Sequence, residues 1–462
     1  MSSHKESDRQ RGRTIYRLSL ALSLLFSAAA VYAQSSAPAV ATDPQPASTV
    51  SIDLAEALQR AQTNEPAFAA ALAESEATAL DRSIARAALL PNAVYHNQYL
   101  FTEANGSKNA GGQTGFQPAP IFVANNTIHE YFSQGSVTET LGFKQLADLQ
   151  LASAGAARAA AELEIARRGL VSTVVSLFYS TSAGSRKLQI AQRAATEAAN
   201  FTDLTRKREQ ARESAHADVV KAQLQEQGRN RDLADAKLAS NRARLELAVL
   251  LFPDPRTPFQ LQERTVPALP TREEINTRAS ANNAKLKSAL AALRVSDAGV
   301  LSARAAYLPD LAFNYTYGID APQFASSGPG GVRNLGYSAS ATLDIPLWDW
   351  LASEHRVKQS QIRREAVRVA LSATQRRLVV ALDEGYDEAV VARDQAASLE
   401  SSVSTATESL RLTRLRYANG EATVLEVVDA QNALTTAENA REDGSIRFQA
   451  ALANLQSLTG TL

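Results

Sequence analysis

The sequence predicts a mainly α-helical, internally duplicated fold that carries a small β part of four strands. Three observations lead to this prediction. Related segments recur at a fixed spacing, which indicates a duplication. Two runs, at about 145–207 and 352–416, contain no proline and are long enough to need coiled-coil-like partners. Short segments between the helical runs alternate apolar and polar residues, which is typical of β-strands.

The duplication is clearest where a helical pattern gives way to a strand pattern. Residues 85–99, ARAALLPNAVYHNQY, and residues 303–317, ARAAYLPDLAFNYTY, are identical at seven of fifteen positions. Farther along the chain, 217–225 aligns with 425–433. A duplicated unit of roughly 200 residues is therefore expected. The two predicted repeats span residues 51–260 and 261–462.

Each repeat has the same predicted order of elements. A helix ends at a Leu-Pro pair, because proline cannot continue it, and two strands, a long helix and a return helix follow. In the first helix of each repeat, Asn64-Glu65-Pro66 aligns with Asn282-Asn283-Ala284. The first repeat has predicted helices at 53–90, 145–207 and 217–251 and a strand pair at about 92–143. The second has them at 271–308, 352–416 and 423–458, with a strand pair at about 311–347.

The strand pattern is strongest in the second repeat. From Phe313 to Ile319 every second residue is aromatic or apolar, and a second alternation runs from Leu335 to Ile345. Four strands are too few for a closed single-chain membrane barrel, which starts at about eight strands. The strands are therefore expected either to close by assembly with other copies or to cover the core of a soluble α+β protein.

Residues 1–33 are expected to be an export signal. A basic segment precedes an apolar run of about 14 residues, Leu18–Val31, and a small-x-Ala sequence ends at Ala33. The run is short for a membrane helix, and no other stretch reaches about 18 apolar residues, so entry into a membrane would have to use strands. A buried or anchoring helix is the alternative, but the prolines of residues 34–50 favour an N-terminal linker there.

The composition excludes several classes of protein and site. The chain of 462 residues has no cysteine, so it forms neither a disulfide nor a thiolate metal site. Basic and acidic residues balance at 48 each, which gives no reason to expect nucleic acid as a partner. The histidines are scattered, so we expect no catalytic residue, cofactor, metal ion or enzymatic activity. Asp383-Glu384 and Asp387-Glu388 are interpreted as a solvated helix face.

The order of elements, the export signal and the segment RYANGEATVLEVVDAQ at 416–431 together resemble the TolC-like outer-membrane efflux proteins of Gram-negative bacteria, also called outer membrane factors. The resemblance covers about 51–462. It implies a homotrimer in the cell outer membrane. Each chain would give four strands to a twelve-stranded transmembrane β-barrel, and the coiled-coil-like helices would form an α-helical barrel in the periplasm.

The resemblance also implies a function. Such proteins are passive exit ducts of tripartite efflux or type I secretion systems. The expected partners are a periplasmic adaptor (membrane fusion) protein, an inner-membrane transporter of RND or ABC type, and outer-membrane lipid. The cargo stays open between drugs, metal ions, oligosaccharides and proteins. The alternatives are a periplasmic coiled-coil adaptor or structural envelope protein, which the duplication and the amphipathic strands disfavour, and an envelope hydrolase, for which no nucleophile–base pair is found.

Three acidic residues match the positions where this family narrows its tunnel. They are Asp218, Glu426 and Asp429, and in a trimer each would form a ring of carboxylates that attracts cations. Tyr417 matches a tyrosine that helps tie the inner and outer coiled coils together at this periplasmic gate. The alternative is that the acidic residues only complement the positive end of a helix dipole.

The two hairpin turns are expected to contact the adaptor through Arg212, Asn419 and Gly420. Arg212 stands where the second repeat has Gly420, and a left-handed backbone is costly for arginine. The first turn is therefore expected to be wider or differently shaped. Ala422 stands where some family members have an arginine that locks the tip, so fewer charged contacts are expected to hold it.

Six aromatic residues are expected at the membrane interface, because aromatic side chains gather at the edges of membrane barrels. They are Tyr95, Tyr99, Tyr315, Tyr317, Tyr337 and Trp348. Trp348 lies in the segment IPLWDW at 345–350, which replaces an apolar-Gly strand ending of the family. A packing role inside the tunnel is equally open for one of the two tryptophans in this segment.

Overall fold

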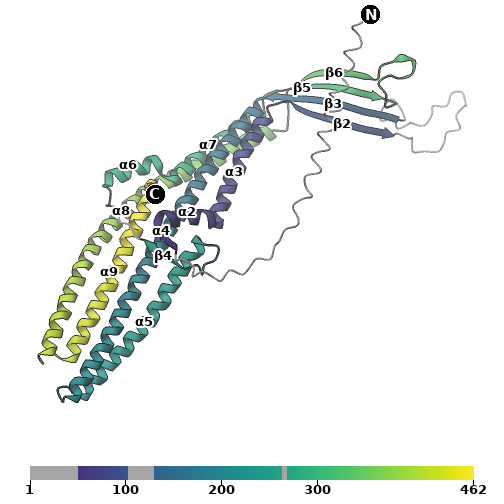
Figure 1. Ribbon diagram of the computed structural model, residues 1–462. Coiled ribbons are helices and arrows are strands. Elements are labelled where there is room, and N and C mark those ends of the chain that lie inside the picture. The colour runs from purple at the N-terminus through teal and green to yellow at the C-terminus, as the bar shows by residue number, and fades with distance from the viewer. Residues whose placement is uncertain (1–49, 102–128, 263–267, 462) are drawn as a thin grey trace, which may run out of the picture. The chain divides into compact units, whose positions relative to one another are not determined.

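The structure is a computed structural model, and it describes residues 50–101, 129–262 and 268–461. The predicted export signal at 1–33 and all but the last residue of the predicted linker lie outside these residues. The described residues are mostly helical and include a four-stranded sheet, which confirms the predicted fold class (Figure 1).

One order of elements, strand, two helices, two strands and two long helices, occurs twice. The first set is β1 (Val50–Asp53), α2 (Leu54–Asn64), α3 (Pro66–Ala87), β2 (Asn92–Phe101), β3 (His129–Gly142), α4 (Phe143–Gln210) and α5 (His216–Leu251). The second set is β4 (Phe259–Gln262), α6 (Arg272–Asn282), α7 (Ala284–Ala305), β5 (Asp310–Ala321), β6 (Leu335–Asp344), α8 (Ala352–Ala418) and α9 (Val424–Thr459).

The first predicted helix of each repeat is in fact two helices. The chain leaves the helix at Glu65, whose φ is −80° and ψ 114°, and Pro66 begins the next helix. Asn283 breaks the second repeat without a proline, because its side chain accepts a 2.9 Å hydrogen bond from the backbone N–H of Leu286 and so caps a new helix. The predictions of single helices at 53–90 and 271–308 are therefore wrong.

The large sheet is antiparallel, with strand order β2-β3-β5-β6. Its register aligns Tyr95 with Gly135, Gly135 with Tyr317, and Tyr317 with Tyr337. Successive side chains on a strand point to opposite faces, so this register puts one set of aromatic residues on one face. That set includes Tyr95, Tyr99, Tyr315, Tyr317 and Tyr337, whereas the other face carries polar residues such as Gln134, Thr138, Asn314, Thr316, Ser338 and Ser340. Within the described residues, the outer edges of β2 and β6 pair with no strand.

A second, two-stranded sheet was not predicted. In it β1 and β4 pair in parallel, with Val50 opposite Phe259 and Ile52 opposite Leu261. Ile52 and Phe259 are buried in a hydrophobic core with residues of α2, α4 and α5. Strands of four residues give too short an alternation for a reliable prediction.

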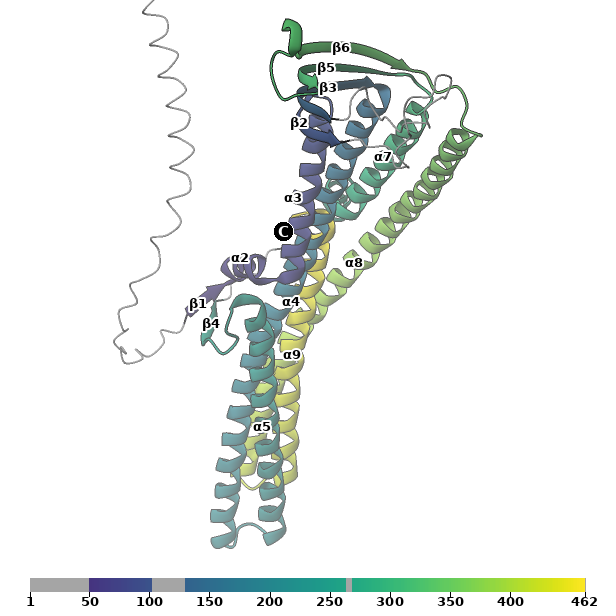
Figure 2. The ribbon, with the colours of Figure 1, turned by 90° about the vertical axis from the view of Figure 1, so that its right-hand side faces the viewer.

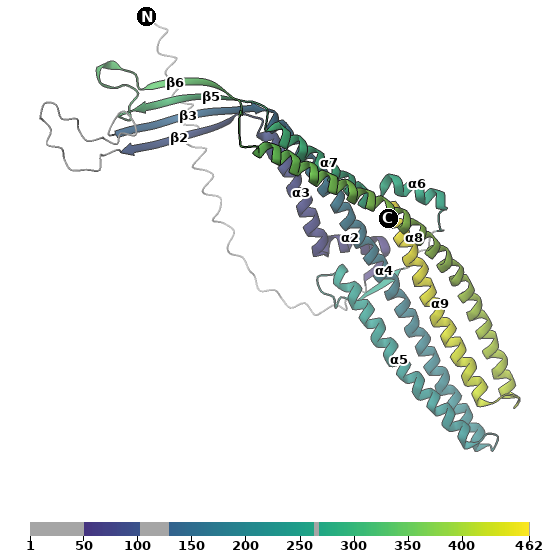
Figure 3. The same cartoon turned by 180° about the vertical axis from the view of Figure 1, so that it is seen from behind.

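The four longest helices form two hairpins, α4 with α5 and α8 with α9. Their turns lie at the end away from the large sheet, and the hairpins lie side by side because α9 packs along α4 and also contacts α5 (Figures 1 and 3). Nearer the sheet, α3 takes the place of α5 beside α4, and α7 lies between α4 and α8 (Figure 2). None of the described helices combines the length and the hydropathy that crossing a membrane requires.

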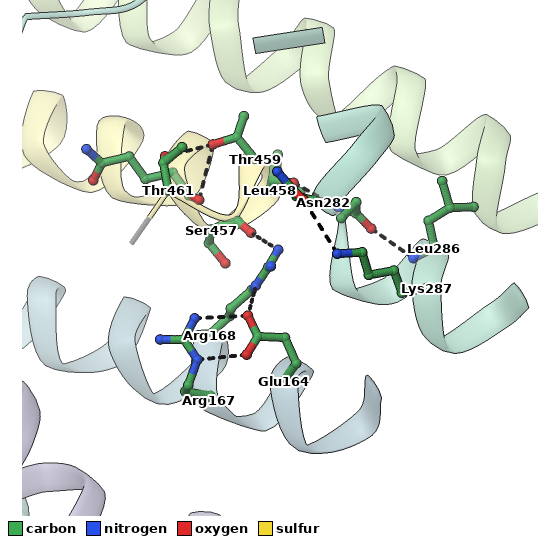
Figure 4. Close-up of polar contacts among 12 residues, drawn as sticks. Glu164, Arg167, Arg168, Asn282, Leu286, Lys287, Ser457, Leu458, Thr459 and Thr461 are labelled. Carbon is green, nitrogen blue, oxygen red and sulfur yellow. Dashed lines mark hydrogen bonds and ion pairs between the residues drawn. The ribbon is translucent and has the colours of Figure 1, made fainter. Parts of the chain in front are cut away.

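Side-chain caps join helix ends that are distant in sequence. Asn64 Nδ2 donates a 2.9 Å hydrogen bond to the carbonyl of Leu251 at the end of α5, and Asn283 Nδ2 donates one of 3.1 Å to the carbonyl of Leu458 in α9. At the same end of α9, Arg168 donates a 3.2 Å bond to the carbonyl of Ser457 (Figure 4). Each cap satisfies a carbonyl that has no partner within its own helix.

Candidate functional site

The candidate site is the end of the molecule where both hairpins turn. We call the two turns and the adjoining helix ends, residues 197–225 and 410–432, the tip region. The two turns have the same backbone geometry, with φ of +64° at Arg212 and +79° at Gly420. The residue after each left-handed position donates a 2.8 Å backbone hydrogen bond into the last helical turn, as in a Schellman motif. These bonds run from Glu213 to Arg208 and from Glu421 to Arg416.

The expectation of a wider or different first turn is therefore wrong. Arg212 adopts the left-handed conformation that glycine adopts in the second turn, although a side chain there costs about 1–2 kcal/mol. The backbone bonds that close the turn offset that cost. Arg212, Asn419 and Gly420 are all exposed, so they are accessible to a partner protein.

The turns differ in how the return helices begin. Thr423 and Glu426 form a capping box at the start of α9, in which each side chain accepts a 3.3 Å hydrogen bond from the other residue's backbone N–H. Glu426 also lies 3.4 Å from Arg416 Nη1. In the first hairpin, Ala215 gives α5 no side-chain cap, and Asp218 accepts a 3.2 Å bond from Ser214 Oγ.

The three predicted gate carboxylates lie at the starts of the return helices. Asp218 and Glu426 take equivalent positions in the first turns of α5 and α9, and both are hydrogen-bonded there. Asp429 is exposed and has no hydrogen bond or ion pair within the described residues. The contacts of Glu426 agree with the alternative role at the helix start. Whether these three carboxylates lie at a pore axis depends on further copies of the chain, so their role in a gate stays a prediction.

Tyr417 lies between the hairpins. Its side chain is only 6% exposed, and its ring centroid is 5.3 Å from that of Phe201 in α4. Ala222 of α5 and the apolar residues Val424 and Val427 of α9 complete this cluster, so it joins all four helices of the tip region. The Tyr417 hydroxyl is buried and has no hydrogen-bond partner within the described residues.

Arg208, in the last turn of α4, reaches across to the second hairpin, which the sequence did not suggest. Its guanidinium carbon is 4.8 Å from the centre of the Tyr417 ring, and Nη1 donates a 2.6 Å hydrogen bond to the carbonyl of Tyr417. Nε lies 3.4 Å from Glu213 of the first turn. A charged contact thus holds the tips together even though Ala422 replaces an arginine. Sequence could have shown only that Arg208 aligns with Arg416 of the second repeat.

Farther from the turns, ion pairs connect α4 to the second hairpin. Arg414 lies 2.7 Å from Glu197, and Arg193 lies 2.8 Å from Glu438. Arg186 pairs with Glu442, a carboxylate that is 3% exposed. The hairpins are therefore joined along their length by charges, and at the tip by the apolar cluster and Arg208.

The acidic pairs of α8 are exposed, and three of the carboxylates also bind arginines from other helices. Arg272 of α6 lies 2.8 Å from Asp383 and also pairs with Asp387. Glu388 accepts bonds of 2.6 and 2.9 Å from Arg447 of α9, and these bonds lower the pKa of Glu388. The interpretation of a merely solvated face missed these contacts.

The segment between β6 and α8 exposes both tryptophans. Trp348 and Trp350 form an edge-to-face pair with centroids 6.0 Å apart, and Trp350 is 83% exposed. Trp350 and Leu351 have left-handed backbones, and Asp349 stabilises the helix start by accepting a 2.7 Å bond from the backbone N–H of Ser353. The described residues contain no group of three His, Asp or Glu side chains that could hold a metal ion.

Comparisons with known proteins agree with this architecture. A family model described as "Outer membrane efflux protein" matches residues 276–461. Outer membrane protein OprJ of Pseudomonas aeruginosa is 25% identical over 163 residues, which are 35% of this chain and 34% of OprJ. Protein CyaE of Bordetella pertussis is 28% identical over 200 residues, 42% of this chain and 41% of CyaE. The matched part thus spans between a third and about two fifths of these curated relatives.

Solved structures match over far more of the chain. The Campylobacter jejuni CmeC outer membrane channel has a TM-score of 0.74 at 14% identity, covering 88% of this chain and 85% of that one. The open state of the Neisseria gonorrhoeae MtrE outer membrane channel has a TM-score of 0.72 at 18% identity, covering 92% and 97%. Outer membrane protein VceC of Vibrio cholerae has a TM-score of 0.73 at 16% identity, covering 88% of this chain and 96% of that one. The family model thus matches most of the second repeat, and these outer membrane channels share the fold over most of the chain.

Proposed function

We propose that the chain is a channel subunit of the cell outer membrane and forms the passive exit duct of a tripartite efflux or type I secretion system. The observation that carries this proposal is the large sheet. One of its faces carries aromatic residues, the other is polar, and both outer edges lack a partner strand within the described residues. Strand edges are not tolerated in lipid, so such a sheet has to be completed by strands of other copies. A homotrimer would close twelve strands.

The two faces of the large sheet differ in chemistry, so each is assigned to a different environment in the proposed barrel. In the proposed trimer, the aromatic face contacts outer-membrane lipid and the polar face lines a water-filled passage. Tyr95, Tyr99, Tyr315, Tyr317 and Tyr337 then lie at or near the membrane interface. Trp348, at the junction with α8, marks the periplasmic boundary of the membrane.

The helical part is proposed to cross the periplasm and to end at the tip region. There the exposed turns, with Arg212, Asn419 and Gly420, contact a periplasmic adaptor that links the duct to an inner-membrane transporter of RND or ABC type. Asp218, Glu426 and Asp429 form carboxylate rings at the narrow end, and these rings favour cations. The duct itself is passive and performs no enzymatic reaction.

A periplasmic adaptor is the second candidate, because the helical hairpins alone would suit one. The four-stranded sheet disfavours it, since an adaptor has no use for an aromatic sheet face whose edges are open.

The test combines fractionation with conductance. The full chain, expressed with its own N-terminus, should appear in the outer-membrane fraction as a trimer that resists detergent until it is heated, and it should conduct ions in planar bilayers. A stable monomer in mild detergent that keeps its strand content would contradict the proposal. So would a protein that follows the inner-membrane fraction.

A further inference from the structure

We propose that a cavity at the junction of four helices binds a small organic anion that has an apolar body, such as an aromatic carboxylate. The cavity has a volume of about 390 Å³ and lies where α9 ends and α7 begins, between α4 and α8. It is separate from the tip region, since none of the described residues that line it belongs to 197–225 or 410–432. The inference rests on the proposed function only where it places this cavity on the wall of the passage.

The cavity lies at a point where two helices meet without joining. Helix α9 ends at Thr459 and α7 begins at Ala284, and Asn283 connects the two ends. Its Nδ2 donates a 3.1 Å hydrogen bond to the carbonyl of Leu458, while its Oδ1 accepts one of 2.9 Å from the backbone N–H of Leu286. Leu458 and Leu286 lie on the two sides of this junction (Figure 4). The side-chain cap thus fixes the start of α7 at the edge of the cavity.

Basic side chains from three helices line the cavity. They are Arg158 of α4, Lys285 of α7 and Arg377 of α8. Lys285 and Arg377 are exposed, and their side chains make no hydrogen bond or ion pair within the described residues. Arg158 pairs with Glu162 at 2.8 Å through Nε, which leaves its Nη groups without a partner there. Glu162 is the only carboxylate among the described lining residues, so two positive charges are left uncompensated.

The polar part of the lining therefore suits an anion. Charges of one sign in a concave site attract a counter-ion and raise its local concentration. The Ser288 hydroxyl also lines the cavity and has no hydrogen-bond partner within the described residues, so it can donate to a carboxylate oxygen. Lys285 is the second residue of α7, so its ammonium group adds to the positive end of that helix dipole.

The rest of the lining is mostly apolar, which indicates what the anion carries. The apolar lining residues are Ile165, Ala289, Ala292, Leu378, Ala381 and Leu458. A bare inorganic anion would leave this surface in contact with water, whereas an aromatic or aliphatic body would cover it and gain the free energy of its burial. Sites for organic ligands have volumes of about 300–1,000 Å³, so this cavity suits a small one.

Helix geometry places the cavity and α2 on opposite faces of α4. Val174 and Phe178 are buried in the core that α4 shares with α2. At about 3.6 residues per turn, both lie on the side of α4 opposite Arg158. In the proposed duct, a further layer of helix and strands on the inside would fill the passage. The face that carries α2 is therefore assigned to the outside, and the cavity to the wall of the passage.

The test compares three probes that share one body and differ in charge. They are cinnamate, cinnamyl alcohol and cinnamylamine, and isothermal titration calorimetry measures their binding to the assembled protein in lipid nanodiscs, with empty nanodiscs as the blank. Cinnamate should bind at one site per chain, and more weakly as salt is raised, because salt screens exposed charges. The alcohol and the amine should bind about tenfold more weakly or less. Equal binding of cinnamate and the alcohol would overturn the inference.

Removing the two unpaired cations should remove the preference for cinnamate. Lys285→Gln combined with Arg377→Gln should weaken cinnamate binding by about tenfold or more. Both side chains are exposed, so assembly should be unchanged. Lys287→Gln combined with Arg376→Gln is the matched control, because it removes the same charge from residues that do not line the cavity. Unchanged binding in the first double variant would overturn the inference, and so would equal weakening in the control.

Conduction separates this inference from the proposed function. In planar bilayers under a salt gradient, the double change at Lys285 and Arg377 should shift the reversal potential toward cation preference relative to the control, because it removes positive charge from the passage wall. Equal reversal potentials would overturn the placement on that wall. If no variant conducts, the proposed function fails while calorimetry still decides on the site. If the unchanged protein conducts but binds cinnamate and the alcohol equally, the site fails and the proposed function stands.

Discussion

Arg168 is a buried charge that two neighbours satisfy. Its Nε donates to Glu164 at 2.7 Å, and its Nη1 donates to the carbonyl of Ser457 near the end of α9 (Figure 4). Gly460 follows with a left-handed backbone, and a Cβ there would lie 2.6 Å from Arg168 Nη2. Glycine is therefore favoured at this position for its backbone conformation, and any larger residue would have to displace the Arg168 guanidinium.

The protonation of Glu164 makes the stability contributed by this cluster depend on pH. Hydrogen bonds from Arg167, opposed by burial and reinforced by Arg168, lower the pKa of Glu164 from its ordinary value of 4.5 to about 2. Because folding lowers this pKa, the unfolded chain takes up the proton first. The stabilisation is fully present above pH 4.5 and is lost as the pH falls from 4.5 toward 2. Thermal unfolding of Glu164→Gln should accordingly depend less on pH across this window than that of the unchanged protein.

A matched control is available on the same helix. Glu162 pairs with Arg158 at 2.8 Å, but both side chains are about half exposed. Glu162→Gln should leave the pH dependence close to that of the unchanged protein, since exposed pairs contribute about 0–1 kcal/mol. Equal pH profiles for Glu164→Gln and the unchanged protein would show that the cluster at the end of α9 is not linked to protonation.

The carboxylates of the predicted gate give a second prediction at the residue scale. Glu426 also caps α9, so Glu426→Gln combined with Asp429→Asn removes charge while glutamine can keep the capping bonds. If these residues line a narrow end, the double variant should lose cation preference and block by multivalent cations in planar bilayers, with trimer assembly unchanged. Glu408→Gln, on an exposed face of α8, is the control. If block by multivalent cations were unchanged in the double variant, both carboxylates would only stabilise the start of α9 and would not line a narrow end.

At the scale of elements, the two hairpin turns can be compared directly, because they have the same backbone geometry but carry different residues at the left-handed position. Arg212 and Gly420 share one backbone conformation, and a Cβ built on Gly420 meets nothing within 4 Å, so substitutions there act through the backbone alone. Arg212→Gly should stabilise the first hairpin and Gly420→Ala should destabilise the second, each by about 1 kcal/mol. Hydrogen exchange at the turn amides of the two hairpins would measure both effects, and effects of the same sign would contradict the shared geometry.

Much of this level of structure could be predicted from the sequence. The long helices begin and end within a few residues of their predicted bounds, because proline-free runs and turn residues are local signals. Pro66 could have indicated the break before α3, but Asn283 breaks its helix through a cap and a long-range bond to Leu458, which no local pattern shows. The hydrogen bond from Arg208 to the carbonyl of Tyr417 could not be predicted, since it joins residues that are 209 positions apart.

At the scale of the whole molecule, the proposed barrel requires that the aromatic face of the large sheet, and not its polar face, contacts lipid. Tyr337 and Ser338 are neighbours on β6 and lie on opposite faces. In the proposed barrel, Tyr337→Lys should cost about 2–4 kcal/mol of stability if residue 337 lies near the membrane centre, and less at the interface. Ser338 would face the water-filled passage there, so Ser338→Lys should cost little. The fraction of trimer that survives detergent before heating measures the difference. Equal losses for the two variants would contradict the assignment of the faces.

Within the described residues the outer edges of β2 and β6 pair with no strand, and in the proposed trimer this has a thermodynamic consequence. If the hydrogen bonds of these strands are completed only by other copies, the sheet cannot have a stability that belongs to one chain alone. By mass action, dilution favours the separated chains, so the midpoint temperature of unfolding should rise with protein concentration. Folding of the sheet and association of the chains would then be a single equilibrium, and the free energy of that equilibrium has meaning only at a stated concentration of chains.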